Sequence, residues 1–331
     1  MAEFPRKTFT VASTGHTYDY IRVEATSPIK STIVFFHGFP AIAFGWRHQI
    51  KYFADHDYGV IAPDLLGYGG TSKPESVSDY CMPVLVEDIM GIIDHERIDR
   101  FHGVGHDTGS ALLSRLYNYH PARLLSLTSI STPYNPPASH FDLEAVNKLT
   151  KGMIGFEKFA YIRFLASDRS PQLIEQHIAS FQSLTYHRDV DVQADNFYPP
   201  GRCEAWLTAD RNDNQTLLDS EDSAAWLRAF RDGGFHGPTN WYRAMTENLS
   251  EEGEKADIAA GKLAIKIDVP VMAIDSKPDK ASLPGFLEGA MAPHAPRLTV
   301  KVVQSQGHYP HIVSKEEVNQ SLHDLISEVD S

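Results

Sequence analysis

Short runs of β-branched and aromatic residues alternate with amphipathic stretches over the first part of the chain. In the amphipathic stretches apolar residues recur at spacings of three and four, which is typical of helices that bury one face. The apolar runs indicate strands, and their alternation with helices predicts a mostly parallel sheet covered by helices. The expected strands are 18–23, 32–36, 59–63, 100–105 and 125–130, and the expected helices are 46–54, 80–94 and 110–119.

The alternation stops at Pro-Tyr-Asn-Pro-Pro, residues 133–137. The chain that follows is helical in pattern, charged and rich in loops, and strand-like runs return only at 269–274 and 298–304, before an amphipathic helix at 315–326. We therefore expect an α/β core that is divided in the sequence by an inserted helical cap. The expected segments are 1–137 for the first part of the core, 138–250 for the cap and 251–331 for the second part of the core.

Composition narrows the class of protein. The chain has 331 residues and a formal net charge of −13, so its field repels nucleic acid and anionic membrane surfaces. Cys81 and Cys203 lie too far apart for a metal or redox motif, which suits a reducing compartment. The N-terminal residues lack the pattern of a secretory signal, and no apolar run has the length of a membrane span. We expect a cytoplasmic enzyme without nucleic-acid or membrane partners, and a homodimer is compatible with the sequence.

Gly105-His106-Asp107-Thr108-Gly109 stands between an expected strand and an expected helix, which is the context of a nucleophile elbow. Its glycines permit a tight turn with a strained central residue. Here that residue is an aspartate, and the positive end of the following helix helps to keep it ionised. The motif by itself is weak, because Asp107 could equally be the cap of the helix.

Phe-His-Gly-Phe-Pro at 36–40 ends an earlier strand, where an oxyanion loop belongs. We expect the backbone N–H groups of Phe39 and Thr108 to form the oxyanion hole. His37 would hold the loop by hydrogen bonds, and Phe39–Pro40 is a candidate cis peptide.

His308 lies in Gln-Gly-His-Tyr-Pro at 306–310, just past the last expected strand, and is the expected general base. The acid that orients it should follow the strand at 269–274. Asp279 is the first choice, and Asp275 remains as an alternative.

The residue types favour an alkylating substrate. A serine that opened an epoxide would become an ether, whereas a carboxylate becomes an ester that water can cleave with the help of a histidine and an oxyanion hole. Opening the ring also needs a proton or hydrogen bond for the leaving oxygen, which a tyrosine can supply. This cycle requires no metal and no organic cofactor.

The sequence resembles the soluble epoxide hydrolases of the α/β-hydrolase superfamily over nearly its whole length. The resemblance rests on His-Gly-Phe-Pro at 37–40, Trp-Arg-His-Gln-Ile at 46–50, Gly-Tyr-Gly at 67–69, Gly-His-Asp at 105–107, Thr-Pro-Tyr-Asn-Pro at 132–136 and the cap motif Gly-Pro-Thr-Asn-Trp-Tyr-Arg at 237–243. It implies an eight-stranded α/β-hydrolase sheet with a helical cap that closes over the carboxyl ends of the strands.

The resemblance also implies that two cap tyrosines, Tyr242 and Tyr161, grip the epoxide oxygen, with Tyr186 and Tyr198 as competitors for the second place. It further implies a substrate pocket between core and cap. Two departures from the family stand out: Thr108 replaces the usual tryptophan, and Pro278 alters the acid loop. The expected pocket residues are His37, Phe39, Pro40, His106, Tyr161 and Trp241.

We therefore expect an epoxide hydrolase that acts on a predominantly apolar epoxide. A haloalkane or haloacid dehalogenase uses the same aspartyl ester, but it would need an indole N–H or arginines beside the nucleophile, where this chain has Thr108 and Ser110. A ligand receptor on a hydrolase scaffold is the alternative from another class. A serine esterase is disfavoured because no serine occupies the elbow.

Overall fold

The computed structural model describes residues 4–27 and 29–331 and contains one eight-stranded sheet in the order β1-β2-β4-β3-β5-β6-β7-β8. β1 pairs antiparallel with β2, β2 pairs antiparallel with β4, and all further neighbours are parallel. The strands are β1 Arg6–Thr10, β2 Thr17–Val23, β3 Thr32–Phe36, β4 Gly59–Pro63, β5 Phe101–His106, β6 Leu124–Ile130, β7 Val271–Lys277 and β8 Leu298–Gln306.

Every strand expected from the apolar runs is present, which confirms the mostly parallel sheet. β1 was not expected, because its sequence Arg-Lys-Thr-Phe-Thr is polar and largely exposed and so carries no hydrophobic signal. It is held at the sheet edge by pairing with β2. A polar edge strand of this kind also discourages pairing with other chains.

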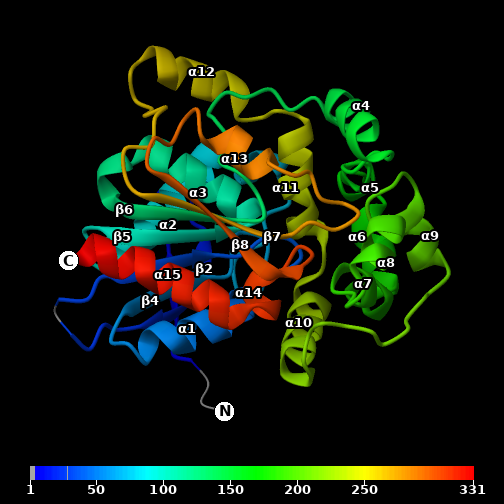
Figure 1. Cartoon of the computed structure of the whole chain (residues 1–331), viewed down its shortest axis with the longest axis horizontal. Helices are drawn as coiled ribbons and strands as arrows, with labels where there is room; N and C mark the ends of the chain where they lie inside the picture. Colours follow the sequence, from blue (N-terminus) through cyan, green and yellow to red (C-terminus); the bar gives the residue numbers. More distant parts are fainter. Residues whose placement is uncertain (1–3, 28) are drawn as a thin grey trace.

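Helices cover both faces of the sheet (Figure 1). Ile33 and Phe35 of β3 belong to one buried cluster with residues of α1 and α15, whereas Val34 and Phe36 belong to the other with residues of α3. Because successive side chains of a strand point to opposite faces, a strand buried on both sides becomes continuously apolar. The helices of the core are α1 Arg47–Ala54, α2 Met82–His95, α3 Thr108–Tyr119, α12 Glu251–Ala259, α13 Phe286–Met291, α14 Pro310–Val313 and α15 Lys315–Asp330, with short 3-10 turns η1 Ala43–Trp46, η2 Val77–Tyr80 and η3 Pro121–Arg123.

Between β6 and β7 the chain leaves the sheet and forms a group of helices on one side of the molecule (Figure 1). No strand occurs among these described residues, and the one isolated β-bridge there joins His187 and Thr216. These helices are α4 Leu143–Ile154, α5 Tyr161–Leu165, α6 Ser170–Gln176, α7 Ile178–Thr185, α8 Val190–Asn196, α9 Arg202–Thr208, α10 Ser220–Gly233 and α11 His236–Thr246. Across the described part of the chain, none of the helices is both long and apolar enough to cross a membrane.

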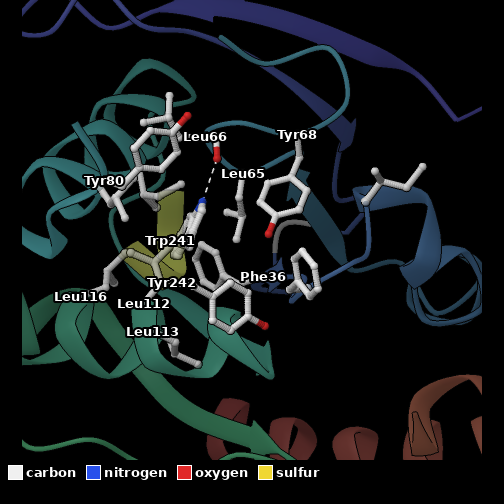
Figure 2. Packing of buried hydrophobic residues seen from close by; sticks show 14 of the residues in the cluster. Phe36, Leu65, Leu66, Tyr68, Tyr80, Leu112, Leu113, Leu116, Trp241 and Tyr242 are labelled. Atoms are coloured by element: carbon white, nitrogen blue, oxygen red, sulfur yellow. Dashed lines mark hydrogen bonds between the residues drawn. The ribbon is translucent and has the colours of Figure 1, made fainter. Parts of the chain in front are cut away.

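The helices α4–α11, which we call the cap helices, are joined to the sheet and its covering helices by close contacts, two of which involve α11 (Figure 2). Trp241 of α11 donates a hydrogen bond from Nε1 to the carbonyl oxygen of Leu66, at 2.8 Å. Beside it, a Cβ atom added to Gly237 would lie 2.6 Å from the Cα atom of Gly67, so both positions require glycine for the two backbones to meet. The helix that carries Tyr242 is therefore set directly against the loop after β4.

Candidate active site

Asp107 stands at the sharp turn between β5 and α3, with φ +53° and ψ −124°. This backbone conformation is strained for a residue with a side chain. The turn is possible because Gly105 and Gly109 pack without side chains: a Cβ atom on Gly105 would lie 2.7 Å from the carbonyl oxygen of Gly109. A non-glycine residue held at positive φ between two such glycines is the geometry expected of a nucleophile elbow.

The loop after β3 runs beside Asp107 and contains the expected cis peptide between Phe39 and Pro40. The backbone N–H of Phe39 donates to Oδ1 of Asp107 at 3.0 Å. His37 holds this loop: its Nε2 accepts from the N–H of Leu65 at 2.9 Å, and its Nδ1 donates to the carbonyl oxygen of Gly38 at 3.0 Å. Both ring nitrogens of the buried His37 are thus occupied, so it supports the loop and is not placed to bind substrate.

His308 follows β8 and faces the elbow. Its Nε2 lies 3.2 Å from Oδ2 of Asp107. The preceding residue, Gly307, has φ +87°, which lets the chain turn the imidazole back toward the sheet. The two oxygens of Asp107 therefore meet different partners, the Phe39 amide on one side and the imidazole on the other.

His106 has a contact that the sequence did not reveal. It is buried, and its Nε2 donates to the backbone carbonyl oxygen of His308 at 2.8 Å. Burial and the neighbouring His308 lower the pKa of His106 to about 3, so the ring is neutral at physiological pH. His106 was expected to line the substrate pocket; in the structure its buried ring holds the loop that carries His308.

The surroundings of Asp107 favour the ionised form of its carboxyl group over the protonated form. Burial by itself would raise the pKa of Asp107, but the hydrogen bond and charge of the His308 imidazole, together with the Phe39 amide, lower it well below its usual range. The carboxyl group of Asp107 is consequently ionised at neutral pH. An ionised carboxylate beside a histidine is equipped for nucleophilic attack.

The acid that would orient His308 is not decided by direct contacts. Asp279 accepts hydrogen bonds from the N–H of Ala281 at 2.8 Å and from Oγ of Ser282 at 3.0 Å. Asp275 accepts from the N–H of Ser276 at 2.9 Å; burial raises its pKa, and the charge of His308 is among the effects that oppose this. Within the described residues neither carboxylate hydrogen-bonds the His308 ring, so both remain candidates.

The acid loop and the base loop are nevertheless tied together. Gln306 donates from Nε2 to the carbonyl oxygen of Pro278 at 2.9 Å, and Ser276 donates from Oγ to that of Gly307 at 2.7 Å. These bonds hold the segment that contains Asp279 beside the segment that contains His308.

Two tyrosines from the cap helices lie close enough to Asp107 for its charge to act on both phenols. Tyr161 begins α5 and Tyr242 lies in α11, and their ring centroids are 6.2 Å apart. Tyr242 also packs edge-on against Phe39 at 5.0 Å. Burial raises the pKa of Tyr161 well above its usual value, and the negative charge of Asp107 acts in the same direction. The same two effects, together with Tyr161, keep Tyr242 protonated, so both phenols can donate hydrogen bonds.

Tyr186 and Tyr198, the alternatives to Tyr161 as the second cap tyrosine, make different contacts. Tyr186 donates its hydroxyl to the carbonyl oxygen of Pro40 at 2.8 Å, which commits it to supporting the oxyanion loop. Trp226 donates to the same oxygen from Nε1 at 2.5 Å, a contact with no signal in the sequence. The ring centroid of Tyr198 lies 5.9 Å from that of Tyr161, so Tyr198 is a direct neighbour of Tyr161.

Pro40 and Trp241 were expected to line the pocket. The carbonyl oxygen of Pro40 receives the two cap hydrogen bonds just described, and the indole N–H of Trp241 is bound to Leu66. Both residues therefore join cap and core, and their polar groups are not directed at a ligand. In the part of the chain that the structure describes, no group of three or more His, Cys, Asp or Glu side chains is arranged to hold a metal ion.

Comparison with known proteins agrees with this architecture. Residues 31–314 match the protein family described as the alpha/beta hydrolase fold. The chain belongs to the α/β-hydrolase fold family. Within this family the elbow carries the nucleophile, which is the place that Asp107 occupies here.

Several curated relatives of this α/β-hydrolase are named epoxide hydrolases. Epoxide hydrolase A of Mycobacterium tuberculosis is 28% identical over 263 residues, which cover 73% of this chain and 75% of the relative. Epoxide hydrolase 3 of Siraitia grosvenorii is 28% identical over 325 residues, which cover 93% of this chain and 94% of the relative.

Solved structures give the same result. Epoxide hydrolase A from Mycobacterium thermoresistibile superposes with a TM-score of 0.77 at 25% identity, covering 97% of this chain and 98% of that structure. A mutant of an epoxide hydrolase from Vigna radiata superposes with a TM-score of 0.76 at 25% identity, covering 99% and 100%.

Proposed function

We propose that this α/β-hydrolase is an epoxide hydrolase, which converts an epoxide and water to a vicinal diol through an ester on Asp107. The observation that carries the proposal is the placement of an ionised carboxylate at the elbow, 3.2 Å from Nε2 of His308 and within hydrogen-bond distance of the Phe39 N–H. The names of the relatives support it.

In the first step Oδ2 of Asp107 attacks an epoxide carbon and the carbon–oxygen bond of the ring breaks. The leaving oxygen takes a proton from Tyr161 or Tyr242, which donate from the cap side. Oδ1 then becomes the carbonyl oxygen of the ester and stays at the Phe39 amide, where the Thr108 amide completes the oxyanion hole.

In the second step His308 takes a proton from water, whose oxygen attacks the ester carbonyl carbon. When the tetrahedral species collapses, the ester bond breaks and the departing diol oxygen regains a proton from His308. The proton left on the new Asp107 carboxyl group restores the phenol of the cap tyrosine. We assign the orienting acid to Asp279, with Asp275 as the alternative.

The substrate proposal is a predominantly apolar epoxide, bound between core and cap. Its support is the aromatic surroundings of Asp107, which include Phe39, Tyr161 and Tyr242. We also propose that residues 138–250 form the cap as a unit. A cytoplasmic location is supported by the free thiols of Cys81 and Cys203, and a homodimer stays a prediction without direct support.

A single turnover in heavy-oxygen water tests the mechanism. With protein in excess over epoxide, the first diol should carry an oxygen from Asp107 and none from solvent, and the heavy oxygen should appear in the Asp107 carboxylate. A first diol that already contains solvent oxygen would contradict the ester mechanism. Release of halide from a haloalkane without diol formation from any epoxide would instead favour the dehalogenase reading.

A further inference from the structure

Tyr309 lies beside the proposed base but has no part in the mechanism described so far. It follows His308 directly in the sequence and is buried. Its ring stacks on that of Tyr186, with the centroids 4.5 Å apart and an angle of 24°. Because the Tyr186 hydroxyl is bound to the carbonyl oxygen of Pro40, this stack fixes the Tyr309 ring in the site.

The Tyr309 phenol shares its surroundings with the reacting groups. Burial raises the pKa of Tyr309 well above its usual value, and Tyr186, Asp107, Tyr198 and Tyr161 act in the same direction. The ring centroid of Tyr309 lies 5.1 Å from that of His308. A protonated phenol is thus held on the core side of the site, with its ring beside that of His308.

A cavity of about 530 Å³ lies between α8 of the cap and the turn from β8 to α14, and both His308 and Tyr309 line it. Arg188 and Asp189, which also line it, are exposed, so the cavity is open to solvent. Its other lining residues are partly polar and include His187, Gln193, Ser305 and Gln306. Asp107, Tyr161 and Tyr242 are not among its lining residues, so the cavity reaches the base from a different side than the one on which the cap tyrosines lie.

From the stacked phenol and this cavity we propose that Tyr309 orients the hydrolytic water and that the cavity supplies it. The inference rests on the proposed function. The hydroxyl oxygen of Tyr309 accepts one hydrogen of the water while Nε2 of His308 takes the other as a proton. The water then has a lone pair directed at the ester carbonyl carbon of Asp107, and the remaining bond changes are those of the second step above.

Tyr309→Phe separates this role from the others, because only the hydroxyl is removed and the stack on Tyr186 is kept. Rapid-quench measurements on an epoxide should show ester formation at the wild-type rate and ester hydrolysis slower by about tenfold, the worth of one orienting hydrogen bond. In the steady state kcat should fall while kcat/KM is unchanged. Tyr52→Phe, which removes a phenol on the outer helix α1, should leave both rates unchanged.

The cavity is tested at its rim. Val313→Trp introduces an indole at an exposed lining residue and should slow ester hydrolysis without slowing ester formation. Val302→Trp is the matched control, because Val302 is similarly exposed on β8 but lies outside the cavity lining.

Slower ester formation in Tyr309→Phe, with hydrolysis unchanged, would overturn the inference and make Tyr309 a donor to the epoxide oxygen. Unchanged rates for both steps would overturn it as well and leave Tyr309 a packing residue. The proposed function fails separately, in the wild-type protein: if no ester forms on Asp107 with any epoxide, the failure lies there and not at Tyr309.

Discussion

At the scale of single residues, Asp107 combines backbone strain with a charge that its surroundings stabilise. Positive φ holds the carboxylate out from the turn, and the Phe39 amide and His308 bind its two oxygens. Such strain persists where the surrounding structure enforces it, here through the packing of Gly105 and Gly109. The carboxylate is therefore held in the position that the proposed attack on an epoxide requires.

Asp107→Ala should abolish diol formation, because no other carboxylate can form the ester, while the fold is retained. Circular dichroism and a urea titration would check the fold, and product analysis would check the reaction. Diol formation above about 1% of the wild-type rate would show that water attacks the epoxide directly.

His308→Gln is the complementary variant: it should still be alkylated and should accumulate the ester, visible as a mass increase of the intact protein.

The two cap phenols offer the same hydrogen bond, so their removal should be strongly non-additive. Tyr161→Phe and Tyr242→Phe should each slow ester formation by about tenfold, and the double variant should lose about a thousandfold or more. Single-turnover rates of ester formation measure this. If the double variant loses no more than the product of the two single losses, the two phenols act independently of each other.

At the scale of secondary-structure elements, the position of α11 decides where Tyr242 lies. This helix is fixed by the Gly67–Gly237 contact and by the Trp241 hydrogen bond to Leu66 (Figure 2). These two contacts between α11 and the loop after β4 therefore set the position of Tyr242, and neither involves a substrate.

Gly237→Ala should push α11 away from the loop at Gly67, because the new methyl group would lie 2.6 Å from a backbone atom that cannot rotate aside. We expect a loss of about 1–3 kcal/mol in the free energy of unfolding, measured in urea, together with slower ester formation. Gly253→Ala is the control: it lies in α12 with open space around it and should stabilise the chain by about 0.5–1 kcal/mol. Equal stability of the two variants would contradict the close approach.

A charged contact joins α1 of the core to the first turn of α10 in the cap. The buried Arg47 donates from Nε to Oδ1 of Asp222 at 2.6 Å and from Nη1 to Glu221 at 3.1 Å, and it also pairs with Asp219. Burial raises the pKa of Asp222 even with Arg47 beside it. Loss of the arginine would leave this carboxylate without compensation.

Arg47→Met should therefore lower the free energy of unfolding by about 3 kcal/mol, since it breaks a buried ion pair from one side. Lys51→Met is the matched control, because its pair with Asp55 is exposed and should contribute less than about 1 kcal/mol. Urea unfolding of the two variants gives the comparison. A loss below 1 kcal/mol for Arg47→Met would mean that the cap does not depend on this contact.

At the scale of the whole molecule, stability depends on pH because some carboxylates accept hydrogen bonds in the folded state that lower their pKa values. Glu96, at the end of α2, accepts hydrogen bonds from Arg22 at 3.0 Å, from Tyr20 at 2.5 Å and from Lys7 at 3.0 Å, and so ties that helix to the antiparallel edge of the sheet. Burial acts to raise the pKa of Glu96, but these donors lower it to about 2.

In the unfolded chain a glutamate titrates near pH 4.3, roughly. Between about pH 4.3 and the folded pKa of about 2, the unfolded chain binds more protons, so the stabilisation from Glu96 is present above this window and is lost as the pH falls through it. Glu96→Gln should be less stable than wild type at pH 7, and the gap should narrow toward pH 2.5 in urea titrations. The exposed Glu252→Gln should follow the wild-type profile. A gap that stays constant over this range would contradict the shifted pKa.

The sequence by itself determined the seven apolar strands, the helices between them and the place of the inserted helices, because these depend on local periodicity and on the breaks made by proline and glycine. It also singled out Asp107 and His308 as candidates from their places just after expected strands, and the structure brings the two side chains to 3.2 Å of each other. The sequence did not predict the polar edge strand β1. This strand is held by its pairing with β2 and has no apolar pattern that could be recognised.

Only the tertiary structure decided what each polar group near the site contacts. His106 and Trp241 looked like pocket residues in the sequence, yet one binds the base loop and the other binds Leu66. The resemblance placed Tyr161 ahead of Tyr186, but only the structure shows that the Tyr186 hydroxyl donates to the carbonyl oxygen of Pro40. Such partners lie tens to hundreds of positions apart in the chain, so the direction of a hydrogen bond is set by packing between elements, and no local pattern encodes it.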